Sequence, residues 1–419
     1  MSRRALLFLL ALVLVLVALR QPYVWRMVTL RRPDVEDYRA MPTRPIAPAP
    51  RPTPFTAAPD PAWVTRVPFD AAGGRITSQA ELDAFLGAQG TTAFIVVHDG
   101  KLIDERYYQG YGRDSLFKAF SMSKSVLSAL LGIAQGEGVL RVSDTLGAHL
   151  DLAGNRALAG VTLEQLADNV GGLRYRRGDA PWKEQPRMYY TADARGYVAG
   201  ARVVRAPGTT FEADELSPLL LAHALERALR RRHPGITLSG YAEQRLWQPM
   251  GARYGALWTL DRAGDGLEKT ESGLVARAVD LARFGQLYLD GGAAAGRQVV
   301  PREWVEASTT PPAGGAPNRF DDGFHRRLWW GRERPGQQRF DFYSNGHFGQ
   351  RIYVSPDKRL VLVRMGSASG TVNWTAVLSR IAQGWPAARQ GRAAAGQAPM
   401  PDLRSQQVPD PPQSTRSRP

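Results

Sequence analysis

A serine and a lysine stand three residues apart in the segment Ser121-Met122-Ser123-Lys124, at the predicted start of a helix. Side chains three residues apart on a helix face the same way, and the free N–H groups of a first helical turn favour negative charge. A partly buried lysine can lose its proton near neutral pH and then accept the proton of a serine hydroxyl. The pattern therefore predicts Ser121 as a nucleophile and Lys124 as its proton acceptor. The alternative is a capping serine followed by a surface lysine, because this spacing also occurs by chance.

A second polar segment, Asn345-Gly346-His347-Phe348-Gly349-Gln350, stands directly before a predicted strand. A polar side chain followed by glycine at a sheet edge lets a ligand lie close to the backbone. The segment therefore indicates one wall of a binding site. A plain turn that contains an incidental histidine is the other interpretation.

Predicted strands near both ends of the chain, with helices between them, must position these two segments. Runs of β-forming residues and the turn residues between them predict hairpins over residues 92–108 and 350–365. Capping residues and apolar periodicity predict helices over residues 121–136, 217–229 and 373–383. This order predicts an α+β fold, in which an antiparallel β-sheet is flanked by helices and carries a helical subdomain.

Composition divides the chain into four parts. The first has two arginines followed by an apolar run, as in the leader of an exported protein. The run of about 15 residues is short for a bilayer span, but no clear cleavage site follows it. We therefore predict an uncleaved, single-pass signal-anchor in the inner membrane, with the folded domain in the periplasm; a cleaved signal peptide is the alternative. The predicted parts are a signal-anchor or signal peptide (1–30), a Pro-rich linker (31–63), the folded domain (64–385) and a disordered tail (386–419).

Composition also excludes several classes of site. The chain has no cysteine, which excludes disulfides, Cys-ligated zinc, iron–sulfur clusters and a cysteine nucleophile. Its six histidines form no dense cluster with acidic residues, so no metal site is predicted, and no motif implies an organic cofactor. About half of the net charge of +15 lies in the two ends of the chain, so we expect no nucleic-acid partner.

Several ordered motifs together resemble the serine β-lactamase-related hydrolases, a family that includes class C β-lactamases, DD-peptidases, esterases and 6-aminohexanoate-dimer hydrolases. The resemblance covers about residues 75–385 and implies the β-lactamase/transpeptidase-like form of the fold predicted above. Besides the two segments already described, the matching stretches are TLEQLADNVGGL (162–173), APGTTF (206–211), SPLLLAHALERA (217–228), SGLVARAVDLARFGQLYLDGG (272–292) and GHFGQRIYVSPDKRLVLVRMG (346–366).

The resemblance implies a role for each matched residue. Ser121 would be the acyl-enzyme nucleophile and Lys124 its proton partner. His347 and Gly349 would correspond to the K/H-x-G motif of the edge strand. The oxyanion hole would consist of the backbone N–H groups of Ser121 and Gln350.

One position departs from the family pattern. The family has a proton-shuttling tyrosine two residues after the phenylalanine of the PGT-x-F motif, and Ala213 stands there. Loss of a general acid or base typically costs roughly 10²–10⁴ in rate. Tyr190 is our candidate to fill the role. The other candidates are Asp214, Glu215, Tyr189 and His347.

The sequence therefore predicts a membrane-anchored or exported serine hydrolase. Its substrate would be a small-molecule or peptide-like ester or amide. The alternative is a catalytically impaired relative that binds a cell-envelope ligand or partner, which the alanine at position 213 favours.

Overall fold

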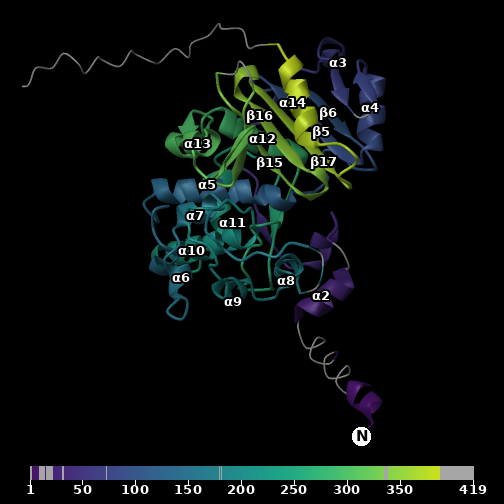
Figure 1. Cartoon of the computed structure of the whole chain (residues 1–419). Coiled ribbons are helices and arrows are strands. Elements are labelled where there is room, and N and C mark those ends of the chain that lie inside the picture. The colour runs from purple at the N-terminus through teal and green to yellow at the C-terminus, as the bar shows by residue number, and fades with distance from the viewer. Residues whose placement is uncertain are drawn as a thin grey trace, which may run out of the picture. The chain divides into compact units, whose positions relative to one another are not determined.

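A nine-stranded sheet forms the upper layer of the structure in Figure 1. The structure, a computed structural model, describes residues 2–8, 15, 22–30, 33–71, 73–178, 180, 182–334 and 338–386. The strand order is β12-β13-β14-β15-β16-β17-β5-β6-β2, and every neighbouring pair is antiparallel except β2 and β6. The strands are β2 (Thr56–Ala57), β5 (Thr91–His98), β6 (Lys101–Tyr107), β12 (Arg319–Phe320), β13 (Gly323–Arg326), β14 (Trp329–Arg332), β15 (Asp341–Asn345), β16 (Arg351–Ser355) and β17 (Leu360–Gly366).

The two faces of this sheet carry separate hydrophobic clusters. Along β5, Phe94 and Val96 join one cluster, whereas Ile95 and Val97 join the other. This alternation follows from the strand geometry, in which successive side chains point to opposite faces. Helices cover both faces, which explains the continuous apolar runs over residues 93–97 in β5 and 360–363 in β17. The covering helices are α3 (Trp63–Arg66), α4 (Gln79–Ala88) and α14 (Trp374–Gly384) on one side and α12 (Ala278–Leu289) on the other.

Helix α5 (Ser123–Gly136) lies between the sheet and a helical subdomain (Figure 1). It is buried along most of its length, which suits its unbroken run of small and aliphatic residues. The helices of the subdomain are α6 (Arg156–Ala159), α7 (Leu163–Ala167), α8 (Glu184–Tyr190), α9 (Ala194–Ala199), α10 (Leu216–Arg232) and α11 (Leu238–Ala242). The predicted α+β fold with a helical subdomain is therefore confirmed.

A second sheet of four strands, in the order β1-β8-β9-β7, lies beside the helical subdomain. Its strands are β1 (Thr43–Ile46), β7 (Phe117–Lys118), β8 (Ala256–Thr259) and β9 (Leu274–Ala276). Strand β7 leads directly into the turn that carries Ser121. The remaining elements are β3 (Phe69–Ala71), β4 (Gly74–Ile76), β10 (Ala293–Ala294), β11 (Arg297–Gln298) and α13 (Arg302–Thr309).

The predicted linker over residues 31–63 is wrong for the residues that the structure describes. Residues 33–63, which we call the N-terminal arm, pack on the domain: β1 pairs with β8, and β2 pairs with β6. The prolines misled the prediction because proline cannot donate to a sheet ladder in a central strand but is tolerated at an edge. β1 is the edge strand of its sheet, and Pro45 lies within it.

The leader and the tail fall mostly outside the described residues. Most of the apolar run from Ala5 to Leu19 is not described, and neither are residues 387–419. Among the residues that are described, no helix has the length and apolar character needed to cross a bilayer. Helix α2 (Pro22–Leu30) packs against α8. The signal-anchor and the disordered tail remain predictions of the sequence.

Candidate active site

Ser121 lies on a short 3-10 turn, Phe120–Met122, which joins β7 to α5. The neighbouring Ser123 fixes this turn, because its hydroxyl donates to the Phe120 carbonyl (2.6 Å) and accepts from the Leu274 N–H (2.9 Å). Phe120 has φ = 47°, in the left-handed region that non-glycine residues rarely adopt. Such conformations cost about 1–3 kcal/mol and cluster at functional sites. The Ser121 side chain is half-buried on this strained turn.

Lys124 lies one helical turn after Ser121, and its side chain is 15% exposed. Its Nζ donates to the Asp214 carbonyl (3.2 Å) and lies 3.6 Å from Glu215 Oε1. Among the described residues, no hydrogen bond joins Lys124 to the Ser121 hydroxyl. Catalytic hydrogen bonds are often long without substrate and shorten when it binds. The nucleophile and base assignments therefore remain predictions, with both groups on one partly exposed turn.

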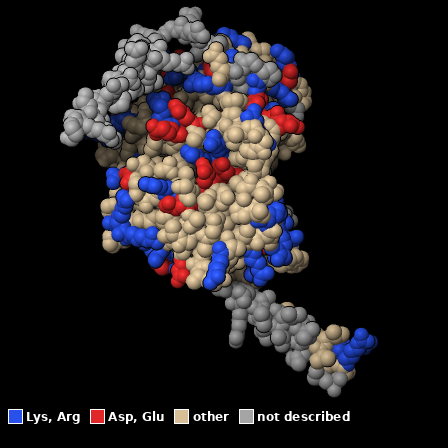
Figure 2. All heavy atoms as spheres, turned by 60° about the vertical axis from the view of Figure 1, so that its left-hand side comes forward, with Lys and Arg blue, Asp and Glu red and all other residues tan. Residues whose placement is uncertain are grey.

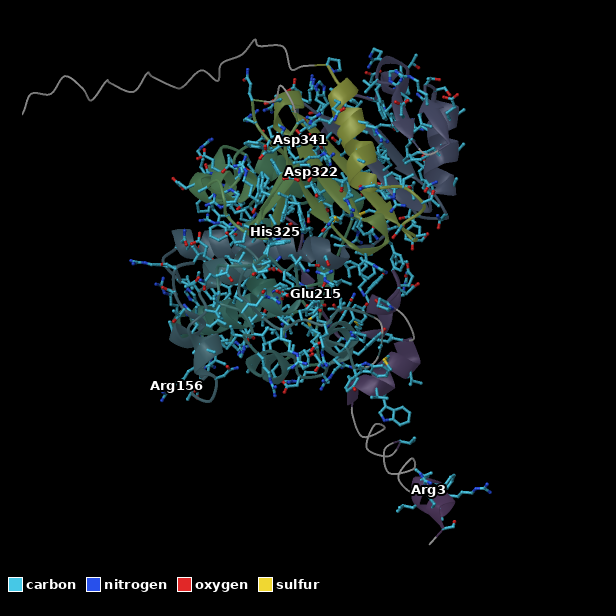
Figure 3. All side chains as sticks on the ribbon, viewed as in Figure 1. Arg3, Arg156, Glu215, Asp322, His325 and Asp341 are labelled. Atoms are coloured by element: carbon cyan, nitrogen blue, oxygen red, sulfur yellow. The ribbon has the colours of Figure 1, made fainter. Side chains whose placement is uncertain are left out.

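Glu215 is an acidic group held beside Lys124 at the start of α10. Burial raises the pKa of the Glu215 carboxyl, the neighbouring carboxylate of Glu271 adds to that rise, and the charge of Lys124 opposes it. Glu215 Oε2 is buried and has no hydrogen-bond partner among the described residues. Figure 3 labels His325 near the level of α5 and Glu215 below it, in the helical subdomain. A carboxyl in this setting can accept a proton from Lys124.

The other predicted acid, Asp214, has a structural task. Its carboxylate accepts from the Ser217 N–H (2.6 Å) and from the Ser217 hydroxyl (2.9 Å), so it caps the first turn of α10. Ala213, just before it, is half-buried, and its carbonyl accepts from Arg177. Of these two acids, Glu215 is therefore the one whose side chain lies beside Lys124, one turn from Ser121.

The loop after β15 lies against the residues that precede Ser121. A side chain at Gly346 would place its Cβ 2.4 Å from the Ala119 carbonyl oxygen, so only glycine fits there. The Phe120 ring packs edge-on against His347 (5.6 Å between centroids) and Phe348 (5.4 Å). Phe348 also has a left-handed backbone, with φ = 58°. The structure thus brings together the two segments that the sequence singled out.

Gln350 has a different environment from the one its predicted role requires. Its N–H donates to the His347 carbonyl at 3.3 Å. Its side chain donates to the Gly366 carbonyl (2.8 Å) and accepts from the Gly366 N–H (2.7 Å). Gln350 therefore joins this loop to β17, and its N–H would have to leave His347 before it could bind a substrate oxygen. Gly349 has φ = 75°, which glycine adopts at little cost.

The two candidate tyrosines lie at the end of α8. The Tyr189 hydroxyl donates to Asp37 and accepts from Lys118, and both partners are buried. The Tyr190 ring packs edge-on against Tyr189 at 4.9 Å and is 2% exposed. The Tyr189 hydroxyl is thus engaged by the buried pair of Asp37 and Lys118. Tyr190 remains an untested candidate.

The sequence missed a buried group of charged residues around Tyr189. We call it the charged cluster: Asp37, Lys118, Tyr189, Lys269 and Glu271. Lys269 Nζ lies 3.0 Å from Glu271 Oε1 and donates to the Met188 carbonyl at 3.1 Å. Its Nζ also lies 5.6 Å from the Tyr189 ring centroid. One signal was present in the sequence: the chain has only six lysines, and two of them, at positions 118 and 269, lie in this cluster.

A hollow of about 670 Å³ opens beside the His347–Gly349 turn. Aromatic rings of Trp330, Tyr343 and Trp374 line it, together with the guanidinium groups of Arg332 and Arg351. Ser121 and Lys124 do not line this hollow. Figure 2 shows Lys and Arg in separate patches over the helical part of one face, with acidic groups among them. No group of His, Cys, Asp and Glu within the described ranges could hold a metal ion.

Comparisons with known proteins show which family and which structures this chain resembles. A family model named Beta-lactamase matches residues 39–383. The 6-aminohexanoate-dimer hydrolase of Paenarthrobacter ureafaciens is 26% identical over 315 residues, which are 70% of this chain and 76% of that protein. A structure assigned as a 6-aminohexanoate-dimer hydrolase from Bacillus anthracis has a TM-score of 0.71 at 22% identity, covering 83% of this chain and 91% of that one. A class C β-lactamase has a TM-score of 0.55 at 14% identity, covering 72% and 93%.

Proposed function

The chain belongs to the beta-lactamase family of serine hydrolases, and from this premise we propose that it hydrolyses an ester or amide through an acyl-Ser121 intermediate. The observation that carries the proposal is the strained turn at Phe120, which presents Ser121 at the start of α5 with Lys124 one turn further on. The adjacent loop at His347 supplies the opposite wall. The hydrolase relative named above acts on an amide-linked dimer by its name, which supports an amide or ester substrate here.

The proposed reaction has two halves. First, the neutral Lys124 amine takes the proton of the Ser121 hydroxyl while Oγ bonds to the substrate carbonyl carbon. The bond to the alcohol or amine then breaks, and that group leaves with the proton held by Lys124. Second, water attacks the acyl carbon and gives a proton to Lys124, which returns it to Oγ as the carboxylic acid leaves.

We assign Glu215 the proton-accepting task that Ala213 cannot perform. The Lys124 ammonium can transfer its proton to the Glu215 carboxylate 3.6 Å away, which leaves a neutral amine beside Ser121. Burial raises the pKa of Glu215 and so favours its uncharged form, because a charge is costly to remove from water. Glu215 is two residues from the alanine that replaces the family tyrosine. The proposed proton acceptor therefore lies in the same loop as the tyrosine whose role it would take.

Glu215→Gln is expected to lower the acylation rate at pH 7 by about 10²-fold. In the native protein, acylation falls as the pH drops and Glu215 takes up a proton, because the Lys124 proton then has no acceptor. Burial and Glu271 raise the pKa of Glu215 while Lys124 opposes them, so this loss begins above the usual range of a glutamate. In the variant this group is absent, so acylation should no longer change over the pH range in which Glu215 titrates. Stopped-flow acylation by an activated ester across this pH range measures both effects.

Two further variants control this test. Glu212→Gln removes a half-exposed acid of the same loop that pairs with Arg205, and it should leave the acylation rate unchanged. Ala213→Tyr should restore part of the acylation lost in Glu215→Gln, because it returns the family's phenol. An unchanged pH profile in Glu215→Gln would show that Glu215 does not handle the proton.

Covalent labelling tests the proposed function itself. The full chain is treated with a fluorophosphonate, and the adduct is located by peptide mass. One adduct on Ser121 is the expected result. Absence of any adduct, with penicillins and activated esters as well, would favour the second candidate function, a relative that binds a cell-envelope ligand without turnover. The alanine at position 213 is the observation that favours that candidate.

We also propose that the leader tethers the domain to the outer side of the inner membrane. The support is the pair of arginines at positions 3 and 4 and the apolar run after them. The full chain should then stay in the membrane fraction after alkaline washing and be digested by protease added to spheroplasts. A soluble periplasmic product that lacks the first residues would show instead that the leader is cut.

A further inference from the structure

The N-terminal arm contributes a charge to the neighbourhood of Ser121. Asp37, on the 3-10 turn Asp37–Ala40, forms an ion pair with Lys118, and their side chains are 3% and 1% exposed. The Tyr189 hydroxyl bonds to both groups, which closes the arrangement. Asp37 is 81 positions from Lys118 in the chain, so this contact exists only when the arm is docked.

Lys118 contacts the strained residue that precedes the nucleophile. Its Nζ lies 4.8 Å from the centroid of the Phe120 ring and 4.8 Å from that of Tyr189. An ammonium at this distance is attracted to the face of an aromatic ring. Phe120 in turn has the left-handed backbone at φ = 47° and packs against His347. The contacts therefore run from Asp37 through Lys118 and Phe120 to Ser121.

We propose that Asp37 is a positioning residue for Ser121: its carboxylate keeps the Lys118 ammonium against the Phe120 ring, and this contact holds the turn that presents the nucleophile. The inference rests on the proposed function for its catalytic consequence. The proposal goes beyond the family resemblance, because it makes the N-terminal arm, through Asp37, a necessary part of the site.

The charged groups around Lys118 determine how the loss of Asp37 changes the pKa of Lys118. Burial lowers the pKa of Lys118, Asp37 opposes that effect most strongly, Glu271 also opposes it, and Lys269 adds to it. The Tyr189 hydroxyl is the remaining titratable partner. Removing the carboxylate therefore makes Lys118 lose its proton at a lower pH, and a neutral amine loses its attraction to the ring.

Asp37→Asn, Lys118→Met and the double variant test the proposal in the full chain. The three readouts are the acylation rate constant, the thermal midpoint, and hydrogen exchange of the peptide covering residues 117–124. Each single variant should slow acylation by roughly 30–100-fold, since displacements of about 1 Å can cost 10² in rate. The double variant should be no slower than either single variant, because both act through one contact.

Stability separates positioning from a merely structural role. Asp37→Asn leaves a buried charge unpaired and should lower the thermal midpoint by several degrees, whereas the double variant removes both charges and should recover most of that loss. The proposal expects acylation and exchange protection to stay impaired in the recovered double variant. Recovery of both with the midpoint would overturn it.

The pH profile and a surface control complete the test. In Asp37→Asn, the decline of acylation at high pH should begin at lower pH than in the native protein. Asp70→Asn removes an exposed partner of Arg75 and should change none of the readouts. If the native chain forms no acyl adduct, the proposed function fails. Hydrogen exchange then tests the positioning role by itself: faster exchange over residues 117–124 that persists in the double variant would support it. If acylation is normal and Asp37→Asn has no effect, this inference alone fails.

Discussion

Ser121→Ala is expected to abolish the acyl-enzyme and to lower turnover of an activated ester by roughly 10⁴-fold or more. The Ser121 hydroxyl would form the covalent bond, and the neighbouring Ser123 hydroxyl cannot replace it because it is buried and bonded to Phe120 and Leu274. Losing a nucleophile of this kind removes most catalysis and leaves only the contribution of binding. Intact mass after mixing with ester, together with steady-state rates, measures both effects.

Ser115→Ala is the matched control for this variant. Ser115 is half-buried, lies six residues before the nucleophile and accepts from the Gly112 N–H at 2.9 Å. This variant should keep native turnover and the native adduct mass. An adduct that persists at full yield in Ser121→Ala would move the nucleophile elsewhere and end the proposed mechanism.

Lys124→Met is expected to lower acylation by about 10³-fold, within the range that a positioned base contributes. Methionine retains much of the apolar stem of lysine but has no amine, so the Ser121 proton has no acceptor one turn away. Glu215 would also lose the group that opposes its raised pKa. Acylation rates of the folded variant, confirmed by its circular dichroism spectrum, check this expectation.

Lys124→Arg separates proton transfer from charge. Arginine keeps the positive charge but stays protonated at all accessible pH values, so it should be nearly as slow as the methionine variant. Lys101→Met, at an exposed position in the β5–β6 hairpin, should behave as the native protein. An arginine variant with native acylation would show that position 124 acts only through its charge.

The sequence predicted those elements correctly whose formation depends on residues close to one another in the chain. The apolar, β-branched runs in residues 92–97 and 360–365 are typical of strands buried on both faces, and the two hairpins are present as β5–β6 and β16–β17. The helices predicted over residues 217–229 and 373–383 are present as α10 and α14. The spacing of Ser121 and Lys124 placed both on one turn. In each case the controlling interactions join residues only a few positions apart.

The candidate site was predicted less completely because its environment is assembled from distant segments. Glu271 and Lys269 influence Glu215 and Tyr189 from a loop before β9, and no local pattern marks them. The role of Asp214 as a cap could be inferred from its position three residues before Ser217, but its burial could not. The N-terminal arm was predicted as a linker because its proline content indicates an extended segment. Proline content alone does not show whether such a segment pairs with the edge strand of a sheet.

The docked arm sets the order in which a newly made chain can mature. β1 leaves the ribosome early, yet its partner β8 lies about 210 residues later, so the pair closes a very long loop. Contacts this distant form late during folding. Asp37 belongs to the same arm and reaches Lys118 only with it. A nascent chain therefore carries Ser121 long before Asp37 can reach Lys118, and the contact proposed to position Ser121 forms only after synthesis has passed Thr259.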